Sequence, residues 1–528
     1  MQDTTDLLST FDHVVVLMLE NRSFDNLLGY LYTDDLPKGK TFEGLYGKTI
    51  KMPVPPEAKG YNEHPFIEPM KKGDYHQPFP DPGEVYQHVN TQLYNYINTA
   101  RPDNRNIPAC IMKAPYNIPN PLPPKEDMMQ GFVKDYINTL NALPGKKGRA
   151  FNNPDYDKYS IIMNCFSPEK VNVLSTLAKD FAIFDHWFCS VPSQTWCNRA
   201  FWHAATSGGQ LVNPLGECGV ENIWDAMKAW TEQVWTNTTI FERMEQNGVS
   251  HAVFTEDLFS LTTLVNGPFK QEHHKGSLNH FKRLLKKENK LPQYSFLEPK
   301  FMGQHNDQHP SSVDRSVSDN QTHIGSVLLG EHLIWEIYTA IFIDPISKYR
   351  DNTLLIITYD EHGGCFDHVT PGPTIPPKKG DIGEMGFEFD RLGVRVPMVM
   401  VSANIQKNTI VNEVFEHTSF IKTMCKKWGM PHLTDRDAAA KSFEQVFSGS
   451  KRTDFPAIQE PNIPSIDPKS YNDDPLNDLQ RSILIGANFM AKNNPMAMKS
   501  AINFDTANQI TTVGEAMDHL QKIKDFIE

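Results

Sequence analysis

One apolar stretch constrains this chain more than any other, because it ends abruptly in acids: Leu354–Tyr359 runs directly into Asp360 and Glu361. A continuous apolar run without alternation is typical of a strand covered on both faces, as in a parallel sheet. The carboxyl ends of such strands are where open α/β sheets bind ligands. Adjacent buried carboxylates repel each other unless a cation lies between them, so the stretch predicts a divalent-ion site. Gly363 and Gly364 would let the backbone approach closely, and the alternative is an acidic turn after a core strand.

A second stretch of the same design lies near the N-terminus, where the apolar run His13–Leu19 is followed by Glu20 and Asn21. A carboxylate and an amide carbonyl both suit a hard or borderline divalent ion. For Ser23 and Asp25, which come next, a role in capping a short helix is the preferred interpretation. Two strands therefore end in oxygen ligands. We predict that one divalent cation is surrounded by Glu20, Asn21, Asp360 and Glu361.

The composition is that of an ordinary globular protein. Of the 528 residues, 39% are hydrophobic and 22% are charged, and the net charge is −13. Large α/β proteins of this length are often built on a single sheet with long insertions between its strands, so we expect one large core. No run approaches the ~18 consecutive apolar residues of a membrane span. The negative charge argues against binding nucleic acid or anionic membranes through a broad positive field. A phosphate-bearing substrate would therefore need positively charged groups within its own binding site.

The seven cysteines are scattered and form no CxxC pair, which argues against a disulfide framework or a zinc knuckle. The first residues lack the basic and apolar regions of a secretory signal. We therefore expect a soluble protein without a transmembrane segment, which is cytoplasmic or exported by a signal-independent route.

Strand-like and helix-like segments alternate along most of the chain. Strands are expected at 182–188, 251–254, 291–298 and 393–402, and helices at 167–181, 240–247, 324–343 and 416–428. Ser167 and Pro168 fit the N-cap and the first turn of the 167–181 helix. Residues 30–80 are rich in Pro, Gly and Lys, and this composition indicates a surface loop. After the Pro-rich 455–478, helices are expected at about 479–493 and 511–527, so we predict a catalytic domain at 1–454 and a linker with a helical appendage at 455–528.

A hydroxyl-rich loop, Ser190–Thr195, leads into a helix that carries Arg199. Backbone N–H groups at a helix start favour anions and arginine adds a rigid positive fork, so a phosphate can sit beside Ser193 or Thr195. Such hydroxyl residues are more often simple caps. The three tryptophans near this loop favour core packing over an aromatic cage for choline: Trp187, Trp196 and Trp202.

Two other polar groups are less specific. Glu84 and His88 lie four residues apart at the start of a helix-like segment, where an exposed pair is the preferred interpretation. The segment Gln304–Pro310, which contains His305 and His309, follows a predicted strand and so could reach the same site.

Three segments stand out as motifs: Glu20–Asp25, Thr195–Arg199 and Asp360–Val369. Together they resemble the phosphoesterase family that contains bacterial phospholipases C, a bacterial acid phosphatase and plant non-specific phospholipases C. Leu291–Tyr294, Asp307–Pro310 and Phe389–Pro397 also match, in the family's order, so the resemblance covers roughly residues 10–430 and is closest to the plant enzymes. It implies an alkaline phosphatase-like α/β fold, a mostly parallel sheet sandwiched by helices, with metal ligands and a hydroxyl nucleophile at strand ends.

The resemblance also implies roles for individual residues. Thr195 becomes the nucleophile, Arg199 neutralises charge on the phosphoryl oxygens, and His309 is a candidate acid for the leaving group, with His305 as its rival. The cation, zinc or calcium, is implied at Glu20, Asn21, Asp360 and Glu361. Substrate contacts are implied for Asn198, Glu84 and His368. Two positions depart from the family: Cys197 stands where Pro is usual, and Glu84 stands where many members have His.

The resemblance implies a phospholipase C that cleaves glycerophospholipids to diacylglycerol and a phosphorylated head group through a covalent phosphothreonine. A broad-specificity phosphomonoesterase would share the same catalytic residues. A protein that binds phosphorylated head groups without cleaving them is the third alternative. Thr195 argues against it, because a hydroxyl, metal ligands and an arginine are the parts that a phosphoryl-transfer site needs together. The expected partners are a phospholipid or small phosphoester, with peripheral contact to a membrane and none to nucleic acid.

Overall fold

A central sheet organises the chain. The computed structural model describes residues 7–98, 114–142, 144–145, 149–150, 153–214, 223–267, 275–311, 325–465, 467–494, 502 and 504–526. Its eight-stranded sheet has the order β13-β6-β12-β11-β1-β10-β8-β9. In that order the strands span Thr409–Val411, Ala182–Phe184, Met398–Val401, Thr353–Tyr359, His13–Leu19, Tyr294–Glu298, His251–Thr255 and Lys275–Gly276. All neighbours are parallel except β12, which runs antiparallel to both β11 and β6.

The two stretches singled out in the sequence form adjacent strands at the centre of this sheet. Every residue of β11 is buried, as is every residue of β1 after His13. The parallel register pairs Leu19 with Tyr359, so Glu20 and Asp360 leave the sheet side by side. The third central strand, β10, pairs with the other edge of β1. The prediction of buried parallel strands that deliver acidic residues to one edge is confirmed.

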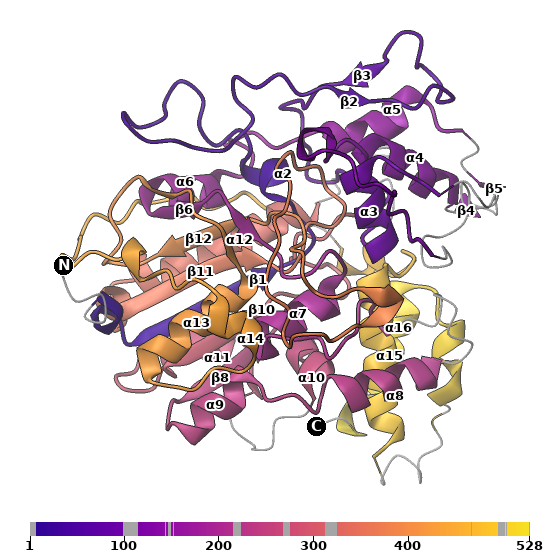
Figure 1. The fold of residues 1–528 in the computed structure, drawn as a ribbon. Coiled ribbons are helices and arrows are strands. Elements are labelled where there is room, and N and C mark those ends of the chain that lie inside the picture. Colours follow the sequence, from indigo (N-terminus) through magenta and orange to yellow (C-terminus); the bar gives the residue numbers. More distant parts are fainter. Residues whose placement is uncertain are drawn as a thin grey trace.

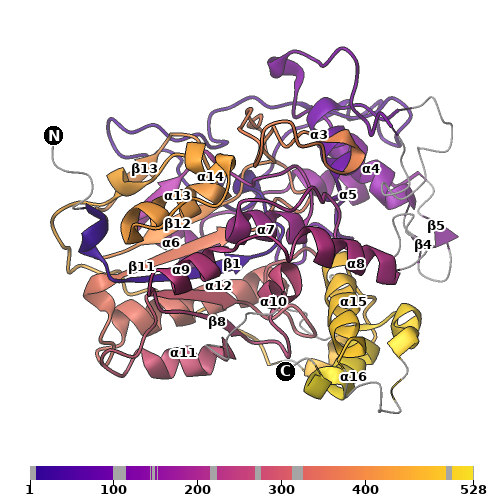
Figure 2. The same ribbon diagram turned by 60° about the horizontal axis from the view of Figure 1, so that its bottom comes forward.

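Helices cover both faces of the sheet (Figures 1 and 2). One side carries α6 (Asn172–Asp180) packed on α12 (Ser326–Tyr338), which continues as a π-helical turn, η6 (Thr339–Ile343). The other carries α7 (Thr195–Ala204), which packs on α10 (Leu261–Asn266) and α13 (His417–Trp428). The remaining flanking elements are α9 (Ile240–Gln246), α11 (Leu278–Leu284), α14 (Asp435–Ala439) and the paired short strands β7 (Trp187–Phe188) and β14 (Phe415–Glu416). The predicted α/β class, a mostly parallel sheet between helices, is confirmed.

The segment after α2 (Phe24–Leu28) forms an upper layer of loops and short elements, drawn in indigo and purple in Figure 1. It contains β2 (Met52–Pro53), β3 (Phe66–Ile67), α3 (Tyr86–Tyr94), α4 (Phe132–Ala142), β4 (Pro144–Gly145), β5 (Arg149–Ala150) and α5 (Tyr156–Tyr159). Its apolar cluster includes Phe366 and Val394 from the loops near the sheet edge. The layer therefore packs on the polypeptide that follows β11.

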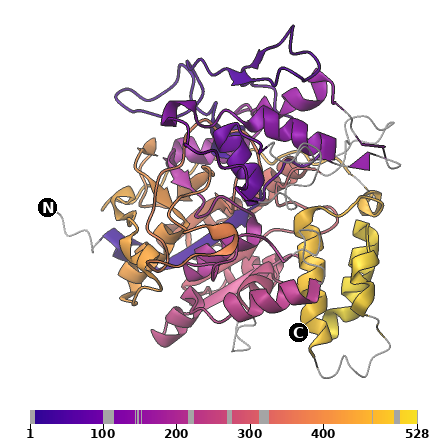
Figure 3. The ribbon, with the colours of Figure 1, turned by 45° about the vertical axis from the view of Figure 1, so that its right-hand side comes forward.

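The C-terminal helices pack on the core (Figure 3). The helix α15 (Asp478–Lys492) contacts α16 (Val513–Ile523), α10 and α8 (Ile223–Gln233). The Pro-rich segment before them lies along α12, where Trp335 Nε1 donates to the Ile458 carbonyl over 2.9 Å. The division at residue 454 remains a prediction, while the two predicted C-terminal helices are present.

The stretch Ser326–Ile343, α12 with its π-helical turn, is the one helix among the described residues that is long and apolar enough to cross a membrane by composition, with a mean hydropathy of 1.3. Its position in the fold gives it a different role, because 56% of it is buried and it packs on α6. Its apolar character is therefore accounted for by contact with the protein core.

Two local predictions are wrong. The helix predicted to begin at Ser167 begins at Asn172, with Val171 as its N-cap, so Ser167 and Pro168 lie outside it. Instead of a local cap, the buried Glu331 of α12 accepts hydrogen bonds from Val173 N over 2.6 Å and Leu174 N over 3.2 Å. Burial raises the pKa of Glu331 to about 8, although these two hydrogen bonds oppose the shift.

The second error concerns Glu84 and His88, which were predicted to form an exposed pair. Both are buried, since Glu84 precedes α3 and the His88 Nδ1 atom lies 2.6 Å from the Asp135 carboxylate of α4. Pairing by sequence spacing fails here because α4 packs on α3 and His88 contacts Asp135 of α4 instead.

We predict that Glu331→Gln changes stability in a pH-dependent way. At pH 5 the variant should be about 1–3 kcal/mol less stable, because one backbone N–H of α6 loses its acceptor. As the pH rises toward 8, wild type must keep a proton that its unfolded chain releases, so its advantage should shrink. Urea unfolding between pH 5 and 8 measures this. The half-buried Glu336 of the same helix provides the control, Glu336→Gln, and a Glu331→Gln difference that is constant with pH would contradict the account.

Candidate active site

The candidate site lies where β1, β10 and β11 end. Glu20 and Asn21 follow β1, Asp360 and Glu361 follow β11, and all four are fully buried. The loop after β10 is tied to them, because the Glu20 N–H donates to the Asp307 carbonyl over 2.8 Å. Three adjacent strands thus bring acidic and amide side chains to one edge of the sheet.

Thr195, the first residue of α7, lies among these side chains. Its hydroxyl donates to Glu20 Oε2 over 3.0 Å and lies 3.4 Å from Asn21 Oδ1. The Asn21 N–H in turn donates to Asp360 Oδ1 over 3.0 Å. Ser193, the alternative hydroxyl, donates to the Leu211 carbonyl and so belongs to the loop. Of the two hydroxyl residues, Thr195 is the one in contact with the predicted metal ligands.

Arg199, one helical turn after Thr195, holds Glu20. Its Nε donates to Glu20 Oε1 over 2.9 Å, and its Nη2 donates to the same oxygen and to the Met18 carbonyl. Both partners of this ion pair are fully buried, so each depends on the other for compensation of its charge. The remaining nitrogen, Nη1, is buried and has no hydrogen-bond partner in the described structure.

Glu84 reaches the site from the turn before α3. It accepts hydrogen bonds from Asn21 Nδ2 and, over 3.1 Å, from Gln194 Nε2. Its carboxyl also interacts with that of Glu361. Glu84 therefore connects the predicted metal ligands to the loop that carries Thr195.

The predicted ligand set fits a divalent cation. Asp360 Oδ2 and Glu361 Oε1 are buried oxygens without a hydrogen-bond partner among the residues described. Burial, reinforced by the Asp360 carboxylate, raises the pKa of both Glu20 and Glu361 well above the usual range. The carboxylate oxygens of Glu20, Asp360 and Glu361 and the amide carbonyl of Asn21 are hard oxygen donors, which suit such an ion. The structure thus brings Glu20, Asn21, Thr195, Asp360 and Glu361 together.

His309 lies beside Glu84 and is fully buried. Its Nδ1 is 2.9 Å from the Pro310 carbonyl and its Nε2 has no partner among the described residues. The short Nδ1 contact favours the tautomer that keeps its proton there and leaves a bare lone pair on Nε2. Burial lowers the pKa of His309, so the neutral ring is favoured. Its rival, His305, is held 2.6 Å from Asp307 Oδ1.

Two predicted substrate contacts have partners elsewhere. The Asn198 side chain accepts a hydrogen bond from the Val191 N–H and donates to the carbonyls of Val191, Ser193 and Gln194. These hydrogen bonds fix the shape of the loop before Thr195. His368 lies between the Asp25 and Glu43 carboxylates, which raise its pKa to about 9 although burial opposes this. The structure does not bring either side chain into hydrogen-bonding contact with Thr195.

The three tryptophans near the loop are fully buried, and the expected core packing is confirmed. Trp202 stacks on Phe420 with 4.5 Å between ring centroids, and Trp187 stacks on Phe415. Ser23 is the N-cap of α2, as expected, with Asn26 N donating to it over 3.1 Å. Asp25 has a different structural role, because its carboxylate pairs with Arg395 and His368.

Sequence reasoning missed Asp81 and Gln194. Asp81 lies next to Glu84 and His309, and Gln194 links Glu84 to the Asn213 N–H. The signal for Asp81 was present in the Asp-Pro-Gly-Glu turn before α3, where two acids precede a helix. Gln194 carries no such signal, since its role depends on the tertiary position of Glu84.

A hydroxyl at a helix start among buried carboxylates, at the carboxyl edge of an α/β sheet, is typical of hydrolases that act on phosphoric esters. The chain belongs to the phosphoesterase family, whose family model matches residues 11–431. Non-specific phospholipase C6 of Arabidopsis thaliana is 32% identical over 468 residues, which cover 84% of this chain and 74% of that relative. Phospholipase C B of Mycobacterium tuberculosis is 26% identical and covers 59% of this chain and 60% of that relative. The chain is accordingly a hydrolase of phosphoric ester bonds.

Solved structures resemble the chain more distantly. A protein of the alkaline phosphatase superfamily from Vibrio parahaemolyticus aligns with 50% of this chain and 62% of that chain at 12% identity, with a TM-score of 0.29. Murine ectonucleotide pyrophosphatase/phosphodiesterase 5 aligns with 53% of this chain and 96% of that chain, with a TM-score of 0.31. Structural similarities with TM-scores this low support no argument about the site.

We predict that Gly363→Ala lowers turnover of a chromogenic phosphoester at least about tenfold, because small displacements of catalytic groups have large effects. Gly363 has φ of +60°, and a Cβ there would lie 2.3 Å from the carbonyl oxygen of Asn21. The matched control is Gly372→Ala, in the same inter-strand segment, where a Cβ meets nothing within 4 Å. Equal turnover of the two variants would show that the close approach does not position the site.

Proposed function

We propose that the chain is a metal-dependent phospholipase C that releases diacylglycerol and a phosphorylated head group through a covalent phosphothreonine at Thr195. The observation that carries the proposal is the contact of the Thr195 hydroxyl with both Glu20 and Asn21. The names of the relatives, phospholipases C from a plant and a bacterium, support the choice of a phospholipid substrate.

The first step forms a bond between Thr195 Oγ1 and phosphorus and breaks the bond from phosphorus to the glycerol oxygen, which takes up a proton from water and leaves as diacylglycerol. The phosphorus on Thr195 remains esterified to the head group. Glu20 Oε2, which already accepts the hydrogen bond from the hydroxyl, is placed to take its proton. Arg199 keeps Glu20 in the orientation that this transfer needs. A divalent cation at Glu20, Asn21, Asp360 and Glu361 would supply positive charge for the hydroxyl and the phosphoryl oxygens.

In the second step water attacks the phosphorus of this Thr195 diester, which still carries the head group. The bond from phosphorus to Thr195 Oγ1 breaks, and the phosphorylated head group is released. Thr195 regains its proton, and Glu20 is again the nearest group to exchange it. His309 is neutral in its preferred form, with a lone pair on Nε2, so it accepts a proton or a cation more readily than it donates one. These surroundings favour a proton acceptor at His309 over the predicted general acid.

A phosphomonoesterase would use the same residues, so substrate choice separates the two functions. The comparison is between phosphatidylcholine and a chromogenic phosphate monoester under identical metal loading. The phospholipase C proposal expects a higher kcat/KM for the diester, and a higher value for the monoester would favour the phosphatase.

We further propose that the loop between β11 and β12 contacts the lipid surface. Its tip exposes Ile375 and Ile382, which are 51% and 68% accessible, beside Lys378 and Lys379. The loop connects to the site, because Glu384 accepts from Leu211 N over 2.6 Å and the Leu211 carbonyl accepts from Ser193 of the Thr195 loop. Exposed apolar side chains suit insertion into a lipid surface, and Lys378 is paired with Asp381 over 3.5 Å.

We predict that Thr195→Ala lowers turnover by more than about 10³-fold, as loss of a nucleophile does in other hydrolases. Metal content and unfolding temperature should stay close to wild type, because the variant loses one hydroxyl and one methyl group. Thr195→Ser should retain part of the activity, since the hydroxyl remains. Ser193→Ala is the control for the loop, and an inactive Ser193→Ala with an active Thr195→Ala would reverse the assignment.

We predict that Ile382→Glu slows hydrolysis of phosphatidylcholine vesicles about tenfold, the equivalent of withdrawing one buried isoleucine from the lipid. Turnover of a soluble monoester should not change, because the loop tip does not contact Thr195. Ile346→Glu provides the control, since Ile346 is 54% accessible and lies before β11, at the other end of the strand. Equal effects of both variants on vesicles would refute contact through this loop.

A further inference from the structure

A chain of hydrogen bonds begins at the first turn of α7 and runs to Glu84. The Trp196 N–H donates to Asn213 Oδ1 over 2.9 Å, and the Asn213 N–H donates to Gln194 Oε1 over 3.1 Å. A backbone N–H only donates, so the oxygen of the Gln194 amide must face Asn213 and its nitrogen must face away. That nitrogen, Nε2, donates to Glu84 Oε1 over 3.1 Å. The backbone therefore fixes the orientation of the Gln194 amide.

The same chain continues from Glu84 to Asn21 and returns to Thr195. The second oxygen of Glu84, Oε2, accepts a hydrogen bond from Asn21 Nδ2. The opposite end of this amide, Oδ1, lies 3.4 Å from the Thr195 hydroxyl. All the side chains concerned are buried: Asn21, Glu84, Gln194, Thr195 and Asn213. The hydrogen bonds thus form a closed ring of buried groups that starts and ends at the beginning of α7.

The orientation of the Asn21 amide decides what this residue offers to the site. With its oxygen toward Thr195 the amide presents a ligand for a cation and an acceptor for the hydroxyl, and with its nitrogen there it presents neither. Asn21 has φ of +55°, a conformation that few residues other than glycine adopt. This backbone sets the direction of Cβ but not which end of the amide faces Thr195. That choice depends on the hydrogen-bond partner of Nδ2.

We propose that Glu84 and Gln194 are positioning residues, which hold the Asn21 amide with its oxygen toward Thr195. The inference deepens the proposed function and rests on it, because the orientation of Asn21 affects turnover through Thr195. Both Glu84 oxygens face N–H donors, so the carboxyl acts as the acceptor on either side. The histidine that many family members have at this position accepts only one hydrogen bond in its neutral form. The arrangement is therefore specific to chains with an acidic residue here.

The turn that carries Glu84 is itself held in place. Gln92 Nε2, from α3, donates to the Gly83 carbonyl and to Asp135 Oδ2 over 2.8 Å each. Gly83 packs so tightly that a Cβ there would lie 2.2 Å from the ring of His88. A positioning role needs such a fixed turn, because a mobile carboxyl group would not select one end of the amide.

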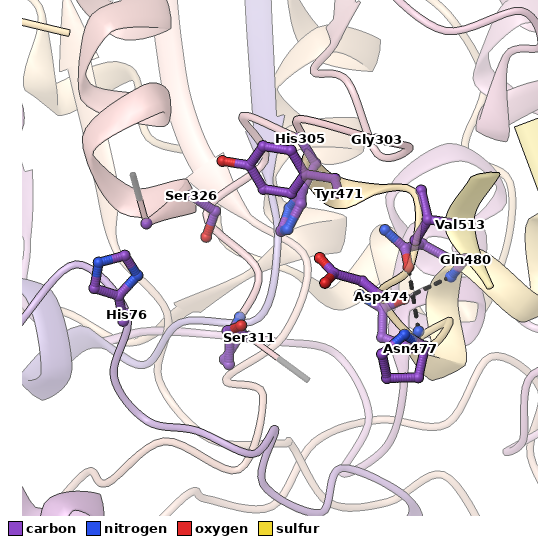
Figure 4. A pocket seen from close by; sticks show the side chains of 13 residues that line it. His76, Gly303, His305, Ser311, Ser326, Tyr471, Asp474, Asn477, Gln480 and Val513 are labelled. Atoms are coloured by element: carbon purple, nitrogen blue, oxygen red, sulfur yellow. Dashed lines mark hydrogen bonds between the residues drawn. The ribbon is translucent and has the colours of Figure 1, made fainter. Parts of the chain in front are cut away.

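The hydrogen-bond chain is separate from the pocket beside the site. This pocket is lined by His76, His305, Ser326 and Asn477 among others (Figure 4). It approaches the site at His309, whose Nδ1 lies 3.5 Å from Asn477 Nδ2. None of the residues that line the pocket belongs to the chain. A substrate in the pocket would meet the same walls when residues of the chain are exchanged, so we expect an effect on kcat and little change in KM.

The test exchanges the two positioning side chains. Glu84→Gln turns an NH₂ group toward either Asn21 or Gln194, and Gln194→Glu sets two carboxyl groups face to face, so each variant loses one hydrogen bond of the chain. We expect each to lower kcat on a chromogenic phosphodiester about 10–100-fold. In the double variant Glu84→Gln/Gln194→Glu every hydrogen bond again has a donor and an acceptor, and the net charge is unchanged. We expect kcat to return to within about threefold of wild type, because the two substitutions compensate each other.

The outcomes separate the positioning role from the proposed function. A folded double variant as slow as the single variants overturns the positioning role, because Glu84 would then act through its own charge. Single variants with the kcat of wild type also overturn it. Thr195→Ala is measured in parallel. If Thr195→Ala stays active, the proposed function fails, whereas an inactive Thr195→Ala beside a slow double variant leaves the proposed function standing.

Unfolding temperatures show whether each variant folds. If the double variant does not, an exchange on the other side of Glu84 gives a second test. In Asn21→Asp/Glu84→Gln the new amide at position 84 donates to the carboxylate at position 21, whose other oxygen faces Thr195. We expect its kcat to be at least about tenfold above that of Asn21→Asp alone, and equal values would overturn the proposal.

Discussion

Buried negative charge at the carboxyl edge of the sheet is the constraint on which the rest of this structure depends. Glu20, Glu84, Asp360 and Glu361 come together where almost none of their surface is accessible to solvent. Uncompensated carboxylates in such surroundings are strongly destabilising, so the fold must supply opposite charge, protons or metal. Arg199 compensates Glu20 directly, and the remaining carboxyls account for the cation chemistry proposed for the site.

A second buried network keeps the two ligand-bearing segments in register beyond the strand ends. Arg395 donates to Asp367 and to Asp25 over 2.9 Å each, and to the Asp185 carbonyl over 2.6 Å. Asp25 belongs to the segment that follows β1, and Asp367 to the one that follows β11. Breaking such a buried pair costs about 3–5 kcal/mol, so this arginine holds together the two segments that carry the predicted metal ligands. His368, expected at the substrate, is part of this network.

The sequence predicts the centre of this protein better than its periphery. The strands and the acidic residues that follow them could be predicted, because a long apolar run must be buried and because adjacent buried carboxylates need a proton or a cation. The positions of Glu84 and His88 could not be predicted, because their burial depends on the packing of the upper layer, and the sequence of that layer has no regular hydrophobic pattern. Asn198 has the spacing of a site residue, yet its hydrogen bonds shape the loop. The protonation of His309 depends on burial and on the Pro310 carbonyl, which only the tertiary structure reveals.

The central claim is that Thr195 carries the phosphoryl group between the two steps. Rapid acid quench during turnover of a phosphodiester substrate, followed by proteolysis and mass spectrometry, tests it directly. The account predicts one phosphoryl group, still esterified to the substrate's head group, on the peptide that contains Thr195, at the threonine itself, and none in the Thr195→Ala protein. Phosphorylation of another residue, or full turnover without any phosphorylated peptide at every quench time, would contradict it.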